Sequence, residues 1–134
     1  MIPVRGLEHI GIRTRDTRTL SRWYGEVFGA KIVSTDDGDP AIYFLSFGGG
    51  GLVELIPDIA ATATDDVHLC LSVDDIDGQV NALRSMGVDV VRQPFTAYEG
   101  SVTAFFRDPA GNLVQLVERV VASAIDAVVY GSPE

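Results

Sequence analysis

The chain has 134 residues, 46% of them hydrophobic, which suits one compact domain. Nineteen acidic residues against ten Lys and Arg give a net charge of −9, which repels a phosphate backbone and argues against nucleic acid as a partner. No apolar run reaches the roughly 18 residues of a membrane span, the N-terminus lacks the apolar segment of a signal peptide, and Cys70 is the one cysteine. We therefore expect a cytoplasmic protein with no membrane partner.

The first elements follow from the spacing of apolar residues. Ile10 and Ile12 alternate with less apolar neighbours, which predicts a strand with one face on the core. Asp16 suits a helix N-cap, and apolar residues at helical spacing predict an amphipathic helix over 17–28 that Gly29 ends. Three strands are then expected, at residues 31–34, 41–47 and 52–56, with the four glycines at 48–51 forming a hairpin.

The second half repeats the first. His68-Leu-Cys-Leu-Ser-Val-Asp-Asp75 matches the segment from His9 to Asp16, and Leu-Val-Gln115-Leu-Val matches Leu-Val-Glu54-Leu-Ile at nearly the same spacing. The repeat predicts a strand at 67–73 and a helix at 76–86 that Gly87 ends. Three further strands are expected, at residues 89–92, 101–107 and 113–117, with a tight turn at 108–112.

The two halves define the predicted architecture. We expect an α+β fold of two βαβββ modules, at about 5–56 and 64–118, within a single domain over 5–120. The modules together would form an open eight-stranded cup with the helices outside. Residues 121–134 match nothing in the first half and are expected to form a C-terminal tail, apolar enough up to residue 130 to dock on a neighbour.

Strand alternation places the chemically interesting side chains. Residues that alternate with the core positions of their strands point away from the helices, onto the concave face of the cup. Four polar residues have this parity: His9, Glu54, His68 and Gln115. Imidazole nitrogens and a carboxylate are ligands of first-row divalent metals, and a carboxamide oxygen can be a fourth. The sequence therefore favours one shared metal site over the alternative, four separate structural roles.

Two other residues near this constellation receive structural interpretations. By strand spacing, Cys70 is expected to be a small buried hydrophobe. Glu118 has the parity of the face opposite to Gln115, so we interpret it as a surface charge at a strand end. The acidic residues occur in scattered pairs such as Asp36-Asp37, which favours a solubilising surface.

Over residues 5–120 the sequence resembles the vicinal oxygen chelate superfamily, which comprises glyoxalase I, bleomycin-resistance proteins and extradiol dioxygenases. The matching motifs are Leu7-Glu-His9-Ile-Gly-Ile with Asp16, Trp23-Tyr24 to Phe28-Gly29, Val53-Glu54-Leu55, His68-Leu-Cys-Leu-Ser-Val-Asp74 and Asp108-Pro-Ala-Gly-Asn-Leu-Val-Gln115-Leu. The resemblance implies that His9, Glu54, His68 and Gln115 bind one divalent metal ion, which could be Zn, Ni, Co, Mn or Fe. Most metal-dependent members have Glu where this chain has Gln115, so the role of proton-transferring base passes to Glu54.

The resemblance leaves three functions open. The leading hypothesis is a metal-dependent lyase, isomerase or epimerase of the glyoxalase type that transfers a proton next to a metal-bound carbonyl of a small-molecule substrate. Glu54 would be its catalytic residue, and Arg13 would suit an anionic group of the substrate. The alternatives are a metal-free small-molecule-binding protein, like the bleomycin-resistance proteins, and an extradiol-type dioxygenase. A homodimer is expected, because relatives also assemble their cups from two subunits.

Overall fold

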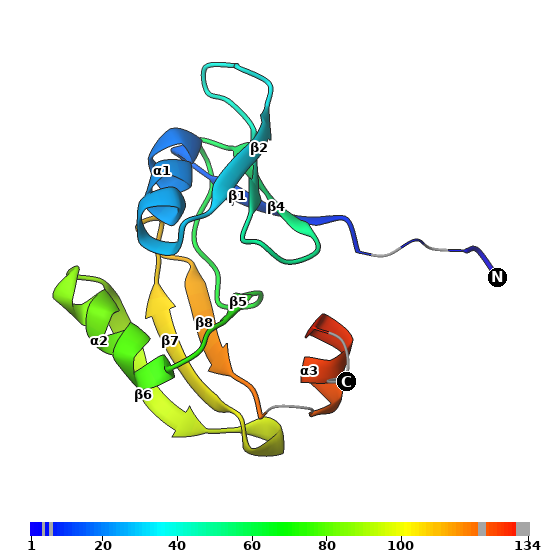
Figure 1. Ribbon diagram of the computed structural model, residues 1–134. Coiled ribbons are helices and arrows are strands. Elements are labelled where there is room, and N and C mark those ends of the chain that lie inside the picture. The colour runs from blue at the N-terminus through cyan, green and yellow to red at the C-terminus, as the bar shows by residue number, and fades with distance from the viewer. Residues whose placement is uncertain (4, 6, 121–122, 131–134) are drawn as a thin grey trace. The chain divides into compact units, whose positions relative to one another are not determined.

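The protein is described by a computed structural model that covers residues 1–134 except 4, 6, 121–122 and 131–134. Its contacts divide the chain into two compact units, residues 1–63 and 64–134, each with one four-stranded mixed sheet. Figure 1 shows the order of the elements along the chain. The predicted fold class is confirmed: each unit is a βαβββ module, and the fold is α+β.

The first unit follows the predicted order of one strand, one helix and three strands. Its elements are β1 (His9–Thr14), α1 (Thr17–Phe28), β2 (Lys31–Thr35), β3 (Tyr43–Ser46) and β4 (Leu52–Pro57). The sheet order is β1-β4-β3-β2, so the parallel pair of β1 and β4 joins the start of the module to its end. The first and last strands of the repeat are therefore neighbours.

Helix α1 begins and ends where its capping residues predict. The Asp16 carboxylate accepts hydrogen bonds from the Thr19 hydroxyl at 2.7 Å and from the Thr19 backbone N–H at 3.0 Å, and both contacts lower the pKa of Asp16. Gly29 has φ of 70°, a left-handed conformation that glycine adopts without the strain of a Cβ. The buried side of the helix carries Leu20 and Tyr24, which face the core that β3 and β4 also line.

The second unit has the same order with two additional short helices. Its elements are β5 (Leu69–Ser72), α2 (Ile76–Ser85), β6 (Asp89–Thr96), the short 3-10 helix η1 (Tyr98–Gly100), β7 (Val102–Arg107), β8 (Leu113–Glu118) and α3 (Ala124–Tyr130). The sheet order is β5-β8-β7-β6, again with a parallel pair of first and last strands. The main differences from the prediction are that β5 is shorter, that β6 continues past Arg92, that η1 follows it, and that part of the predicted tail is the helix α3.

Glu118 stabilises the start of α2, a role that the sequence did not reveal. Its carboxylate accepts a hydrogen bond from the Ile76 backbone N–H at 2.9 Å, at the helix end where negative charge is favourable. The expected parity of Glu118 is correct, but its interpretation as a surface charge at a strand end is wrong. It connects the end of β8 to the first turn of α2.

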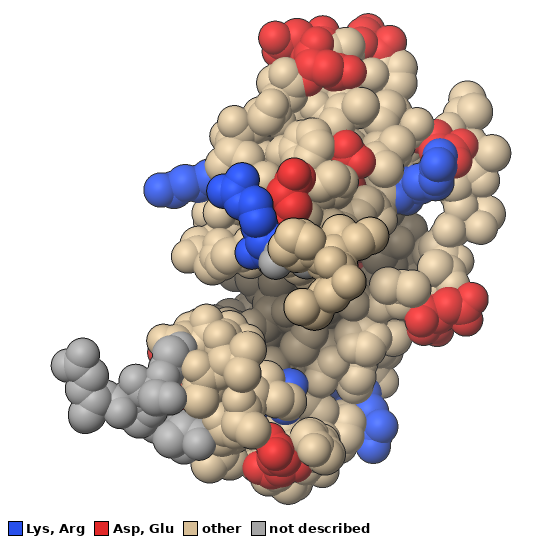
Figure 2. Space-filling view, turned by 90° about the vertical axis from the view of Figure 1, so that its right-hand side faces the viewer, with Lys and Arg blue, Asp and Glu red and all other residues tan. Residues whose placement is uncertain are grey.

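Charged residues are dispersed over the face of the molecule that Figure 2 shows. On the face drawn in Figure 2, the acidic side chains of the described residues lie in several separate groups, with basic side chains between some of them. This pattern agrees with a solubilising surface. Within the described part of the chain, no helix is long and apolar enough to span a membrane.

Candidate functional site

In each unit, the sheet has one face toward its helix, α1 or α2, and an opposite face that we call the site face. In the first unit the site face carries His9 and Glu54, on the adjacent strands β1 and β4. The imidazole Nε2 lies 3.9 Å from the Glu54 Oε1, and the two side chains are 38% and 18% exposed. The first unit therefore brings together two of the four predicted site residues.

Aromatic and acidic neighbours orient the His9 ring. Phe44 lies opposite Glu54 in the β3–β4 register, and its ring meets that of His9 edge-on at a centroid distance of 5.4 Å. On the other side of the imidazole, Nδ1 is 2.6 Å from the Glu8 carboxylate. In a neutral imidazole, a hydrogen bond from Nδ1–H to Glu8 selects the tautomer in which Nε2, the atom that faces Glu54, has its lone pair available to a ligand.

Gly11 lies beside Glu54 in the β1–β4 register and leaves room next to the carboxylate. A Cβ at this position would come within 2.9 Å of the Ile56 Cδ1 and 3.7 Å of the Glu54 Oε1. A side chain here would therefore crowd the approach to the carboxylate.

The second unit repeats the arrangement with Gln115 in place of the carboxylate. His68 directly precedes β5, and its Nε2 lies 2.9 Å from the Gln115 Oε1. Phe105 lies opposite Gln115 in the β7–β8 register, and its ring meets that of His68 edge-on at 5.8 Å. Each unit thus brings together one imidazole, one side-chain oxygen and one phenylalanine ring.

Thr103 determines which end of the Gln115 side chain faces His68. The Thr103 hydroxyl is 2% exposed and donates its one proton to the Leu116 carbonyl at 2.8 Å, so toward Gln115 it can only accept. The Gln115 Nε2 donates to it at 2.6 Å, which directs the carboxamide oxygen toward His68. Sequence reasoning missed Thr103, although its position two residues before Phe105 gives it the site-face parity.

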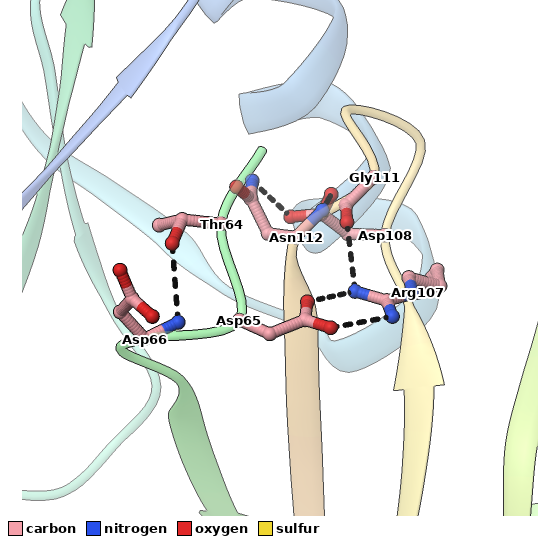
Figure 3. A network of polar contacts seen from close by, with 7 residues as sticks. All are labelled: Thr64, Asp65, Asp66, Arg107, Asp108, Gly111 and Asn112. Carbon is pink, nitrogen blue, oxygen red and sulfur yellow. Dashed lines mark hydrogen bonds and ion pairs between the residues drawn. The ribbon is translucent and has the colours of Figure 1, made fainter. Parts of the chain in front are cut away.

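A polar network holds the segment that leads to His68 (Figure 3). The Arg107 guanidinium pairs with both carboxylate oxygens of Asp65, with 3.0 Å between Nη2 and Oδ2. These hydrogen bonds lower the pKa of Asp65. Beside them, the Asp108 carboxylate accepts hydrogen bonds from the backbone N–H groups of Ala110 and Asn112 and from the Asn112 side chain. The network connects the segment that precedes β5 to the end of β7 and the β7–β8 turn.

The structure also describes the surroundings of Cys70 and Arg13, two residues about which the sequence makes predictions. Cys70 is exposed, so the expectation of a buried hydrophobe is wrong: it lies on the site face, beside Gln115 in the β5–β8 register. Partial burial still raises the pKa of its thiol, while the nearby Arg119 acts in the opposite direction. Arg13, the predicted contact for an anionic substrate group, has its Nη1 3.4 Å from the Asp58 carboxylate.

Among the described residues, no three His, Cys, Asp or Glu side chains are grouped as they would be around a metal ion. Each unit by itself supplies one pair, His9 with Glu54 and His68 with Gln115. The four predicted ligands are therefore found as two pairs.

Comparison with known proteins identifies the family of this fold. A family model described as Glyoxalase/Bleomycin resistance protein/Dioxygenase superfamily matches residues 6–116. A Vibrio parahaemolyticus protein named "Probable lactoylglutathione lyase" is 28% identical over 127 residues, which cover 87% of this chain and 92% of that protein. A lactoylglutathione lyase of Arabidopsis thaliana is 31% identical over 83% of this chain, which spans only 43% of that longer protein.

A solved structure supports the fold independently. The antibiotic binding protein TnmS3 from Streptomyces superposes with a TM-score of 0.75 over 90% of this chain and all of the other, at 20% sequence identity. At that identity the similarity concerns the fold alone.

Proposed function

The chain belongs to the Glyoxalase/Bleomycin resistance protein/Dioxygenase superfamily, and on that premise we propose that it is a divalent-metal-dependent lyase or isomerase of the glyoxalase type. The observation that carries the proposal is the repeated pair: an imidazole nitrogen facing a side-chain oxygen at equivalent positions of both units. Relatives named lactoylglutathione lyase support the same class of reaction.

The spacing within each pair fits joint ligation of one ion. Two ligands at about 2.1 Å from a metal lie roughly 3 to 3.5 Å apart at right or tetrahedral angles. The two observed separations, 2.9 Å and 3.9 Å, lie close to that range. We propose that His9, Glu54, His68 and Gln115 hold a single ion, with the second pair supplied by the same chain or by another copy.

A bound divalent ion would act as a Lewis acid that polarises a carbonyl of the substrate. Glu54 then accepts the proton from the neighbouring carbon and returns it to the adjacent one, because a carboxylate can take up a proton and the Gln115 carboxamide cannot. Glu54 is mostly shielded from water, which helps it to retain the proton between the two steps.

Metal analysis of protein purified without added metal or chelator tests the proposal. We expect near-stoichiometric metal in the native chain, and loss of it in a variant with both His9→Ala and His68→Ala. No metal in the native chain, with none taken up on reconstitution, would contradict the proposed site.

Activity of the metal-loaded protein tests the role of Glu54. We expect turnover of hemithioacetals of 2-oxoaldehydes, by analogy with the relatives' names, and its loss in Glu54→Gln. The matched control is Glu26→Gln, which removes an exposed carboxylate from α1. Equal turnover by Glu54→Gln and the native chain would assign the proton transfer to another group.

A metal-free small-molecule-binding protein is the second candidate. Aromatic rings on the site face favour it, namely Phe44, Phe95 and Phe105. Binding of aromatic ligands by protein that takes up no metal would establish this function instead. The homodimer and the cytoplasmic location stay predictions.

A further inference from the structure

Arg92, Phe95 and Phe105 form a continuous group on the site face of the second unit, which we call the arginine–phenylalanine row. Phe105 lies opposite Arg92 on β6 and opposite Gln115 on β8. Residues opposite one another in a sheet project on the same side, so all three positions share the face of the His68–Gln115 pair.

The row consists of direct contacts. The Arg92 Cζ lies 3.5 Å from the centre of the Phe95 ring, a close cation–π contact. The Phe95 ring stacks on that of Phe105 at 6.3 Å with 19° between the planes, and Phe105 in turn meets His68. An apolar surface therefore runs from the guanidinium to the imidazole.

The guanidinium is available to a ligand. Arg92 is exposed and, among the described residues, forms no ion pair, whereas Arg13 and Arg107 each face an aspartate. Stacking on a ring uses the face of the guanidinium and leaves its N–H groups free at the edge. This planar fork matches the two oxygens of a carboxylate.

We propose that the arginine–phenylalanine row binds a carboxylate-bearing tail of the substrate, with Arg92 on the carboxylate and the two rings along the tail. The inference rests on the proposed function, because the His68–Gln115 pair marks the reacting end. Two strand spacings separate the Cα atoms of Arg92 and Gln115, about 10 Å. The substrate is thus an extended anion, rather than a bare 2-oxoaldehyde.

Two hydroxamates of equal length test the proposal, one ending in a carboxylate and the other in a primary amide. Hydroxamates chelate a divalent ion through oxygens on adjacent atoms, so both compounds should bind the zinc-loaded protein. Calorimetric titration should give at least about tenfold tighter binding of the carboxylate compound, because a carboxylate offers the guanidinium two acceptor oxygens and an opposite charge, whereas the amide offers one acceptor oxygen and no charge.

Variants assign this preference to one side chain. Arg92→Gln should abolish the preference, because it weakens the binding of the carboxylate compound much more than that of the amide compound. Arg92→Lys should retain part of it, because the charge remains without the planar fork. Arg84→Gln is the control, since it removes an exposed arginine from α2 and should leave the preference intact.

The outcomes separate the subsite from the proposed function. Equal binding of both compounds by the native protein, or a preference that survives Arg92→Gln, would overturn the subsite alone. If the protein binds neither compound, the proposed metal site is refuted. The carboxylate subsite is then refuted as well, because it is defined by its position relative to that metal site.

Discussion

Replacing Thr103 by valine removes the hydroxyl that orients the Gln115 carboxamide while keeping the shape of the side chain. The hydroxyl makes two hydrogen bonds, at 2.6 Å to Gln115 and 2.8 Å to the Leu116 carbonyl, and both are lost. Leaving buried polar groups unpaired costs about 1 to 3 kcal/mol, so we expect a fall of that size in the free energy of unfolding. Urea denaturation of the metal-free protein measures it.

The same substitution should weaken metal binding. Without its hydrogen bond to Thr103, the carboxamide can rotate and present its nitrogen, which is not a ligand, toward His68. Loss of a partner that orients a ligand typically lowers metal affinity by about 10- to 100-fold. Competition with a fluorescent chelator at pH 7 measures this affinity, and Thr103→Ser should restore it.

A matched variant separates orientation from stability. Thr17 is also buried and donates to a backbone carbonyl, that of Ala41 at 2.6 Å, but it lies on α1. Thr17→Val should therefore lower stability with little change in metal affinity. Native-like metal affinity in Thr103→Val, or an equal loss in Thr17→Val, would refute the orienting role of the hydroxyl.

Three further variants test other contacts. Gln115→Glu should bind metal more tightly but destabilise the metal-free protein in urea, because the Thr103 hydroxyl must turn from Leu116 to donate to the new carboxylate. Leu55→Ala should lower the free energy of unfolding by about 2 to 5 kcal/mol, since this side chain is fully buried; a loss below 1 kcal/mol in the same assay would contradict the packing. The lowered pKa of Asp65 implies stability that is present above the ordinary value near 3.9 and lost as pH falls through the folded value. The difference in melting temperature between the native chain and Asp65→Asn should therefore shrink from pH 7 to pH 3, and a constant difference would argue against the ion pair.

Elements with complete local signals were predictable from the sequence. Helix α1 has an N-capping aspartate, apolar residues at helical spacing and a left-handed glycine, and its predicted bounds of 17–28 are those of the structure. The repeat then placed the equivalent helix and strands of the second half. Each predicted ligand pair follows from the same repeat, because parallel pairing of first and last strands makes them neighbours.

The features that the sequence did not predict depend on strand register, which is determined by contacts between segments far apart in the chain. Pro94 interrupts the apolar pattern, yet β6 continues through it, because an edge strand tolerates a residue that cannot donate a hydrogen bond. The register between β6 and β7 is irregular on both sides of Arg92, and these irregularities determine on which face of the sheet Arg92 lies. A register shift of one residue would have placed Arg92 on the opposite face. Arg92 could therefore not be assigned to the site from spacing alone, whereas the regular spacing of Thr103 and Phe105 does give Thr103 the site-face parity.

The error at Cys70 has a related cause. β5 is short and apolar at nearly every position, so residue type suggested burial throughout. The alternation that exposes His68 applies equally to Cys70, two residues later. For Cys70, the alternation of side chains along the strand predicts exposure correctly, whereas the hydrophobicity of the residue does not.

The division of the candidate ligands into two pairs has a thermodynamic consequence. A pair alone is a weak bidentate chelator, and high affinity requires both pairs on one ion. Binding of the metal and the approach of the two ligand pairs to one another are then linked equilibria. Each raises the equilibrium constant of the other by the same factor. If the second pair comes from another copy of the chain, the apparent metal affinity will rise with protein concentration, and chelation of the ion will promote dissociation.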